Sequence, residues 1–539
     1  MALVLSGSTT ILTHATDTSN IGLGANAVDS ITTGDYNVGI GDNALTAVTS
    51  GINNTGLGYN ALSALSTGNN QLAVGWNALA AATTGHSNTA IGVEALKTLT
   101  TANNNTAVGK LCLRDNTSGA DNVAIGKNAL SVNTTASNNT AVGAYGLTAN
   151  TTGAENVAVG SLALDENTTG STNTAVGNQA LSANTTASDN TAVGQAALAN
   201  NTTGTQNTAI GRSALSANTT ASNNTAVGRV ALSANTTGAN NTAVGRNAMA
   251  NCTTGGQNVA MGYQALDAMT TASNNVAIGN QAVQNTTTGQ QNTAVGTEAM
   301  KANTTGQYNT AMGYHALLAT TTALHNTAIG YTSMKRSTTA AQNTCVGTSS
   351  GENITTSEKN TLIGMFAGQH ITTGNQNLCI GNQAGSSQVT TSSNQLYIAR
   401  DSTAQGNAAT WLYGDGSGNI VQGNNATAWS QASDERIKKN IVNSSDGLVK
   451  INALQVRNFE YRTEDEITVE GLTGVDKSGV QVGAIAQEVE TVFPSAIHTG
   501  NGTQKQLKTD PIFWAMVKAI QELSAKNEAL LTRIEALEG

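Results

Sequence analysis

A serine and a lysine stand five residues apart where the chain becomes rich in charge. Ser433 and Lys438 belong to the segment Ala432–Asn440, which reads Ala-Ser-Asp-Glu-Arg-Ile-Lys-Lys-Asn. A serine hydroxyl becomes a strong nucleophile once a base takes its proton, and a lysine with a lowered pKa can be that base. The same residues also fit a helix N-cap followed by charges in the first turn. The pair alone therefore leaves two interpretations open, a Ser–Lys nucleophile site and a helix start.

Further motifs follow this segment in a fixed order. Gly483–Glu490 reads Gly-Ala-Ile-Ala-Gln-Glu-Val-Glu, Val492–Pro494 reads Val-Phe-Pro, and helical sequence closes the chain. This order is similar to the intramolecular chaperone domains of phage tail fibres and spikes, the peptidase S74 family. The resemblance covers about 106 residues at the C-terminal end of the chain, beginning at the Ser433 motif. It implies a trimeric domain that assembles the preceding fibre and is then released by its own proteolysis.

The resemblance also implies roles for individual residues. It makes Ser433 and Lys438 the catalytic dyad of an autocatalytic Ser/Lys endopeptidase that acts only on its own chain. It puts the scissile bond between Ser433 and Asp434. The other motif residues would shape the site, namely Arg436, Asn440, Gln487 and Glu488. Because the later motif and the repetitive sequence upstream agree with this family, we prefer the dyad over the helix start.

Charge separates the C-terminal part of the chain from everything before it. Charged residues make up 11% of the 539 residues and aromatic residues 3%, whereas a soluble domain has about 25% charged residues. Of the 57 charged side chains, 28 lie between Asp434 and the C-terminus. We therefore predict a domain boundary near residue 430. Beyond it, the family resemblance implies an α+β chaperone domain at residues 431–539 with a C-terminal helix at residues 511–539.

Upstream of this boundary a 17-residue unit repeats from Asn20 to Gly381. A typical unit, Asn190–Gln206, reads NTAVGQAALANNTTGTQ, and its fifth position is glycine in all 22 copies, without insertion or deletion. Asn, Thr and Gly are poor helix formers, and so short a unit cannot hold two packed helices. A coil of two or three short strands with tight turns fits better. We predict a mainly β fold, a parallel β-solenoid of 22 coils that is about 105 Å long at about 4.8 Å per coil.

Positions in the repeat, counted from the first Asn of the unit, predict how each coil packs. Position four is aliphatic or Met in all 22 copies and position nine in 19, whereas positions three and eight are small. We expect the side chains at positions four and nine to fill the coil interior. The small residues at positions three and eight should permit close contact with a neighbouring wall. In the last three coils position nine is Gly351, Gly368 or Gly385. There we expect a narrower shaft or a change of packing.

The repeats also predict that several chains associate. One thin coil buries little surface, so three chains wound together would stabilise so alanine-rich a shaft. NTAVG-type units resemble the head repeats of trimeric autotransporter adhesins, which are β-rolls assembled as trimers. This chain lacks the signal peptide and the membrane anchor of those adhesins, which argues against a bacterial surface adhesin.

The last segment has a heptad pattern. Its a positions are Phe513, Ile520, Asn527 and Ile534, and its d positions are Met516, Leu523, Leu530 and Leu537. Ile at a with Leu at d favours parallel dimers, and Asn527 would set the register, whereas the chaperone family is trimeric. The pattern predicts either a coiled coil between copies or a helix that packs on the body of its own domain.

Several functional classes are disfavoured. The net charge is −9 and the basic residues form no run, which argues against nucleic-acid binding. No 18-residue apolar run exists, so we expect no membrane insertion, and the first residues lack the pattern of a signal peptide. The six histidines have no metal-ligand spacing, and we expect neither a metal nor a cofactor. Three cysteines, Cys112, Cys345 and Cys379, replace small repeat residues, and we expect free thiols.

Together these features predict a homotrimeric bacteriophage fibre, located in the virion and made in the host cytoplasm. Residues 1–19 would attach it to another virion protein. Residues 382–430 form a transition segment that would become the tip after release of the chaperone and contact a host receptor. The alternatives are a structural spacer or decoration fibre without a receptor and, third, a bacterial trimeric adhesin.

Overall fold

Two compact units make up the chain, Met1–Trp429 and Ser430–Gly539. The computed structural model describes residues 19–386, 390–401, 410–414, 420–422, 441–462, 466–467, 479–499 and 505–539. Each unit has its own apolar core. The segment that we predicted to attach the fibre lies, except for its last residue, outside the described residues.

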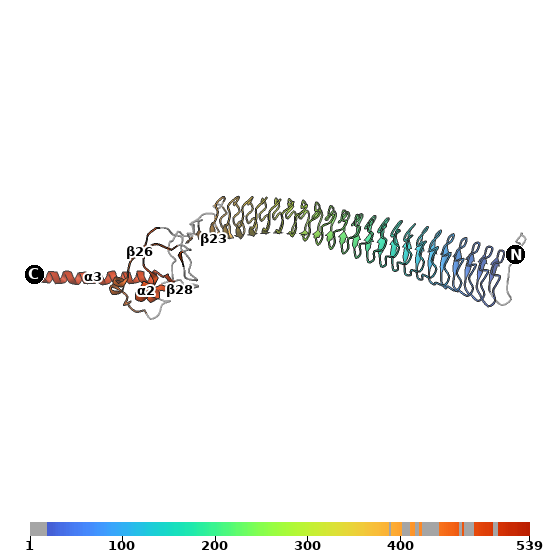
Figure 1. Cartoon of the computed structure of the whole chain (residues 1–539), viewed down its shortest axis with the longest axis horizontal. Helices are drawn as coiled ribbons and strands as arrows, with labels where there is room; N and C mark the ends of the chain where they lie inside the picture. Colours follow the sequence, from blue (N-terminus) through green and yellow to red (C-terminus); the bar gives the residue numbers. More distant parts are fainter. Residues whose placement is uncertain are drawn as a thin grey trace. The chain divides into compact units, whose positions relative to one another are not determined.

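The first unit is a parallel β-solenoid in which every 17-residue repeat forms one coil. Its strands are β1 (Ile21–Leu23), β2 (Val38–Ile40), β3 (Thr55–Leu57), β4 (Leu72–Val74), β5 (Thr89–Ile91), β6 (Thr106–Val108), β7 (Val123–Ile125), β8 (Thr140–Val142), β9 (Val157–Val159), β10 (Thr174–Val176), β11 (Thr191–Val193), β12 (Thr208–Ile210), β13 (Thr225–Val227), β14 (Thr242–Val244), β15 (Val259–Met261), β16 (Val276–Ile278), β17 (Thr293–Val295), β18 (Thr310–Met312), β19 (Thr327–Ile329), β20 (Thr344–Val346), β21 (Thr361–Ile363) and β22 (Leu378–Asn382). Consecutive strands pair in parallel one repeat apart, as Thr191 does with Thr208. Figure 1 shows them stacked in sequence order. The predicted mainly β fold of 22 coils is confirmed.

Each coil turns through residues with positive φ. In the coil that begins at Asn190, Gly194 has a φ of 129°, and Ala196, Leu198 and Gln206 have φ values of 55°, 51° and 58°. A left-handed conformation costs a non-glycine residue about 1–2 kcal/mol, and it persists where the surrounding structure determines it. Turns therefore occupy most of the coil, and only one strand forms per coil. The expected two or three strands per coil were wrong.

Small and polar side chains, with one larger apolar residue, fill the coil interior. In the same coil Asn190, Ala192, Ala197 and Leu198 are fully buried. Val193, at position four, is only partly buried. Side chains alternate across a strand, so when position three points inward, positions two and four point outward. The prediction that position nine fills the coil is confirmed. The prediction that position four fills it, with position three toward a neighbouring wall, was wrong.

Two columns of buried polar side chains lie in the interior, one at position one along the whole shaft and one at position twelve from Asn116 to Asn235. In the first column, at position one, Asn173 Oδ1 accepts the backbone N–H of Asn190 at 3.0 Å. In the second, at position twelve, Asn201 donates from Nδ2 to Asn184 Oδ1 at 3.1 Å and to the carbonyl of Gly204 at 2.9 Å. Buried amides are stable when they are hydrogen-bonded, and here the neighbouring coils supply the partners.

The last three coils exchange volume between core positions. Gly351, Gly368 and Gly385 keep the positive φ of position nine, at 59°, 55° and 63°. A Cβ on Gly368 would lie 2.8 Å from the terminal carbons of Leu362, at position three, and of Ile371, at position twelve. Larger residues at these two positions thus take the space of the missing leucine. The core packing therefore changes in the last three coils, which was one of the two alternatives that we predicted for them.

The parallel ladder continues past the last regular repeat and then reverses direction. β23 (Leu396–Asp401) pairs in parallel with β22, and because Leu396 lies opposite Leu378, this coil is one residue longer than the regular repeat. β24 (Thr410–Gly414) and β25 (Ile420–Gln422) then pair in antiparallel fashion. Within the described residues, the segment we predicted as a transition therefore extends the sheet of the solenoid.

The described residues of the second unit form short strands and three α-helices. Its elements are α1 (Leu448–Ala453), β26 (Arg457–Phe459), β27 (Gln481–Gly483), α2 (Ala486–Val492), the 3-10 helix η3 (Pro494–Ala496), β28 (Ile497–Thr499), β29 (Lys505–Leu507) and α3 (Asp510–Glu538). β26 pairs with β27 and β28 with β29, both antiparallel. Val489, Phe493, Ala496 and Ala515 form the core, so α2 and the start of α3 hold the unit together.

Candidate functional site

The predicted catalytic segment lies outside the described residues. This applies to both members of the dyad, to the scissile bond and to two site-shaping residues, namely Ser433, Asp434, Arg436, Lys438 and Asn440. Their roles stay predictions. The other two predicted site residues, Gln487 and Glu488, lie in the first turn of α2, where Gln487 is exposed.

Glu488 connects α2 to the β26–β27 hairpin. Its Oε1 lies 2.8 Å from Nη2 of Arg457, and its Oε2 lies 3.1 Å from Nε. This two-bond geometry is the strong form of a guanidinium–carboxylate pair. The hydrogen bond to Glu488 raises the pKa of Arg457. Within the described residues Glu488 therefore links α2 to the hairpin, and Arg457 is a partner that the motif did not reveal. The site-shaping role of Glu488 stays a prediction.

Helix α1 is fixed to α3 at its first turn. The backbone N–H of Leu448 donates to Oε2 of Glu522 at 2.9 Å. A carboxylate at a helix N-terminus is favourable, because the first backbone N–H groups lack partners inside the helix. Gly447 allows this approach, since a Cβ there would collide with the Glu522 carboxylate. Glu522 is therefore a positioning residue, one that sequence spacing could not reveal.

Helix α3 presents two different faces. Ala515 and Ala519 are buried against the unit. The apolar heptad residues are exposed instead, with exposed fractions from 47% at Met516 to 85% at Leu537, and the set is Phe513, Met516, Ile520, Leu523, Leu530, Ile534 and Leu537. Small alanines let α3 lie close to the unit. Within one chain, the domain therefore borders the first part of the seam through α1 but leaves the seam side chains largely exposed.

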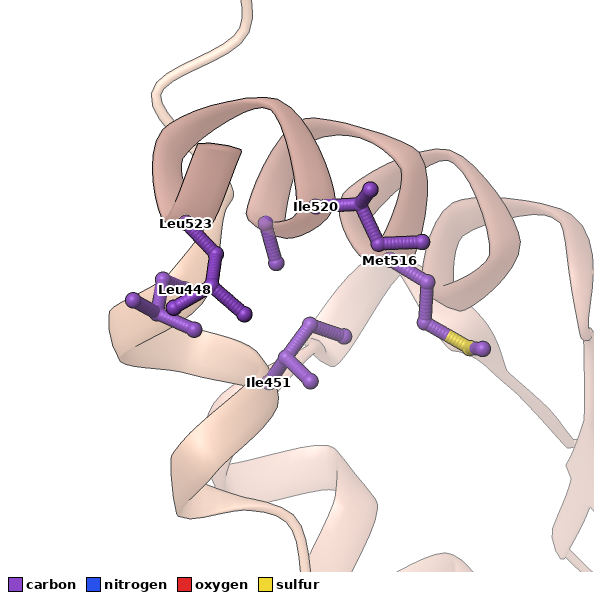
Figure 2. Close-up of a pocket in the computed structure, with 6 residues that line it drawn as sticks. Leu448, Ile451, Met516, Ile520 and Leu523 are labelled. Carbon is purple, nitrogen blue, oxygen red and sulfur yellow. The ribbon is translucent and has the colours of Figure 1, made fainter. Parts of the chain in front are cut away.

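An apolar groove runs along the seam where α1 meets α3. Figure 2 shows Leu448 and Ile451 of α1 opposite Met516, Ile520 and Leu523 of α3. The groove has a volume of about 220 Å³. A second, larger hollow of about 630 Å³ shares Ile451 and Met516 with it. A contiguous row of exposed apolar side chains beside a groove suits an interaction site.

A comparison with known protein families identifies this unit. The family model described as chaperone of endosialidase, peptidase S74, matches residues 433–498. The C-terminal unit contains a chaperone-of-endosialidase domain. The match begins at Ser433, includes Lys438, and continues through α1 and α2 into β28. The family resemblance that the motifs indicated is confirmed, and α3 with its seam lies beyond the matched residues.

No other site stands out in the part of the chain that the structure describes. Those residues contain no group of three or more His, Cys, Asp or Glu that could hold a metal ion. Among them, no helix is long and apolar enough to cross a membrane. All four cysteines are buried free thiols, namely Cys112, Cys252, Cys345 and Cys379. Burial raises the pKa of the Cys112 and Cys252 thiols to about 11, so these thiols are poor nucleophiles.

Proposed function

We propose that the chain is one subunit of a homotrimeric fibre whose C-terminal domain is an intramolecular chaperone. The observation that carries this proposal is the presence, in one chain, of an uninterrupted 22-coil shaft and a chaperone-of-endosialidase domain. The family implies a trimer. A shaft built from identical coils offers many mismatched pairings, and a domain that aligns three chains before the coils form removes that problem.

The largely exposed seam of α3 supports association between copies of the chain. Seven apolar side chains at heptad spacing are exposed in a single chain, and a coiled coil would bury them. The groove between α1 and α3 borders the same seam (Figure 2). Copies of α3 therefore have a surface on which to meet, and the number of three copies rests on the chaperone family.

An Asp in place of Ile520 tests this role of α3 in the full-length protein. A charge in the seam would be desolvated on association, so we expect the Ile520→Asp chain to lose the trimer and to give little soluble fibre. Gln521→Asp is the matched control, because Gln521 is exposed and lies outside the seam. Trimers from both variants, measured by light scattering after size-exclusion chromatography, would argue against assembly through α3.

Self-cleavage belongs to the same proposal. The matched domain begins at Ser433 and includes Lys438, and a lysine base can activate a serine. We assign the cut to the bond between Ser433 and Asp434. Release after assembly would leave the shaft as the mature fibre.

The fibre itself is proposed to be a bacteriophage virion appendage for host attachment. Residues 1–19 would dock on another virion protein, and residues 382–430 would form the exposed tip once the chaperone leaves. The alternative is a structural spacer without a receptor. Particles that carry a fibre lacking residues 382–430 distinguish the two, because loss of host adsorption is expected for a receptor tip and unchanged adsorption for a spacer.

A further inference from the structure

One wall of every coil carries apolar side chains that a single chain leaves partly exposed. Position four is Leu, Ile, Val or Met in all 22 coils. Its exposed fraction is 40% at Ile125 and Ile210, and 42% at Met261 and Met312. Position two, on the same face of the strand, is Thr, Val, Ile or Leu in every coil. We name this set of side chains, positions two and four from β1 to β22, the strand stripe.

The strand stripe is continuous because the ladder is in register. Position two pairs with position two, and four with four, as Thr191 does with Thr208 and Val193 with Ile210. With about 4.8 Å per coil and about 3.3 Å per residue, 22 coils of three residues form a wall of roughly 1,000 Å². Each partner in a standard interface contributes about 800 Å². The stripe has the size of an interface.

The strand stripe contains no charged side chain. Every charged residue between Asn20 and Gly381 falls at position six, seven, ten, eleven, sixteen or seventeen of the repeat, and none falls at position two or four. Interface cores are depleted of charged residues, because an unpaired charge is costly to desolvate. The strand stripe is therefore a wall that another apolar surface can cover without burying a charge.

Stacked aromatic rings border the strand stripe in the coils around Tyr308 and Tyr331. Tyr308 stacks on His325 at 4.7 Å between ring centroids, and both lie at position seventeen. On the other border, at position six, Tyr314 stacks on Tyr331 at 5.3 Å. Tyrosine is enriched at protein interfaces, and aromatic residues make up only 3% of this chain. Both borders therefore suit the rim of an interface.

We propose that the strand stripe is the surface through which the shafts of separate copies of this chain pack against one another, with equal coils at equal heights. The regular spacing of the coils along the stripe indicates which partner can match it. Only a surface with the same rise per coil and the same 22 repeats stays matched along the whole shaft, and a second copy has both. Cyclic symmetry about an axis parallel to the shaft brings each position-four side chain beside its own equivalent. This inference rests on the proposed trimeric fibre and identifies the walls that meet in it.

Single introduced cysteines test which wall lies between copies. Val193→Cys puts a thiol in the strand stripe, and Thr203→Cys, the matched control, puts one on an exposed position of the same coil outside the stripe. The native thiols are buried, with the pKa raised to about 11 at Cys112 and Cys252 and to about 12 at Cys379, so they react slowly. The full-length proteins are treated with a short bismaleimide and analysed on a denaturing gel.

We expect covalent dimers from Val193→Cys and single chains from Thr203→Cys. The mass in solution is measured for each variant. If it is that of three chains, three results would overturn the strand-stripe interface: no covalent dimers from either variant, equal amounts from both, or dimers from Thr203→Cys alone. The trimeric fibre would then stand with a different wall at its centre. A mass of one chain for both variants would overturn the proposed fibre and this inference with it.

Discussion

At the residue scale, the core of each coil depends on how volume is shared between positions three, nine and twelve. Most coils combine a small residue at position three with a leucine at position nine, as Ala90 and Leu96 do, and both are fully buried. Near the end of the shaft Leu362 and Gly368 reverse this order, and Leu362 is fully buried in its turn. The space in the coil interior is thus filled from position nine in most coils and from position three near the end of the shaft.

A double-mutant cycle tests this exchange. Leu362→Ala leaves a cavity and should destabilise the last coils by about 2–5 kcal/mol. Gly368→Leu puts a side chain at a φ of 55° into occupied space and should cost about 1–3 kcal/mol. Together the two changes restore the arrangement of Ala90 and Leu96. We therefore expect the double variant to lose less stability than the two single variants added together, and the difference should be about 0.5–3 kcal/mol. Hydrogen exchange of the last coils measures all three, and strict additivity would contradict the exchange.

The error at position four has a physical cause. Hydrophobicity indicates that Val193 avoids water, but it does not say whether the coil interior or another chain covers it. The interior is so narrow that alanine fills it at position three, as Ala192 does, and alternation then turns Val193 outward. A strand with one small and one large apolar residue can therefore turn either of them into the coil. The width of the coil decides which one faces inward.

Substitution of the predicted dyad tests self-cleavage. Ser433→Ala removes the proposed nucleophile and Lys438→Ala the proposed base, so we expect both variants to stay at full length. The unsubstituted protein should give two fragments, near residues 1–433 and 434–539. A denaturing gel with mass spectrometry of the fragments makes the measurement. Identical full-length bands for all three proteins, or cleavage of the Ser433→Ala chain, would contradict the assignment.

At the element scale, the asparagine column at position twelve links neighbouring coils. Asn201 Oδ1 accepts from Nδ2 of Asn218 at 2.7 Å, while its own Nδ2 donates to Asn184 and to the carbonyl of Gly204. The column is interrupted at Cys252, where the oxygen of the preceding Asn235 has no hydrogen-bond partner within the described residues. Each amide thus depends on the coil on either side.

Removing one member of this column should weaken three coils together. Asn201→Ala takes a donor and an acceptor from buried partners, and each unsatisfied group costs about 1–3 kcal/mol. Asn200→Ala is the control, because Asn200 is the adjacent residue and is exposed. We expect faster hydrogen exchange in the coils of Asn184, Asn201 and Asn218 only for the first variant. Equal exchange in both variants would show that the column contributes little.

The elements of the second unit were predictable to different degrees. The heptad from Phe513 to Leu537 is a local pattern, so the helix and its apolar seam could be predicted from spacing. The contact of Glu522 with Leu448 joins residues 74 positions apart, and no local pattern encodes it. The alanines that dock α3, Ala515 and Ala519, look neutral in sequence, because they matter only by letting the helix lie close.

At the scale of the whole molecule, repetition explains why the shaft was predictable. Every coil contacts mainly the coils next to it, so one 17-residue unit, repeated without insertion, contains nearly all the information for the solenoid. The chaperone domain has no such repeat, and its identification depended on motifs in a fixed order, which the family match at residues 433–498 confirmed. The two surfaces proposed to join the chains, the strand stripe and the seam of α3, look like core residues in the sequence.

The mass of the full-length protein in solution tests the central claim most directly. The Ser433→Ala chain, kept whole by the substitution, is measured by multi-angle light scattering. One chain has a mass of 54.6 kDa, and we predict a particle of three times that mass. A mass of 54.6 kDa at the concentrations where the shaft is folded would contradict the account of a chaperone-assembled trimeric fibre.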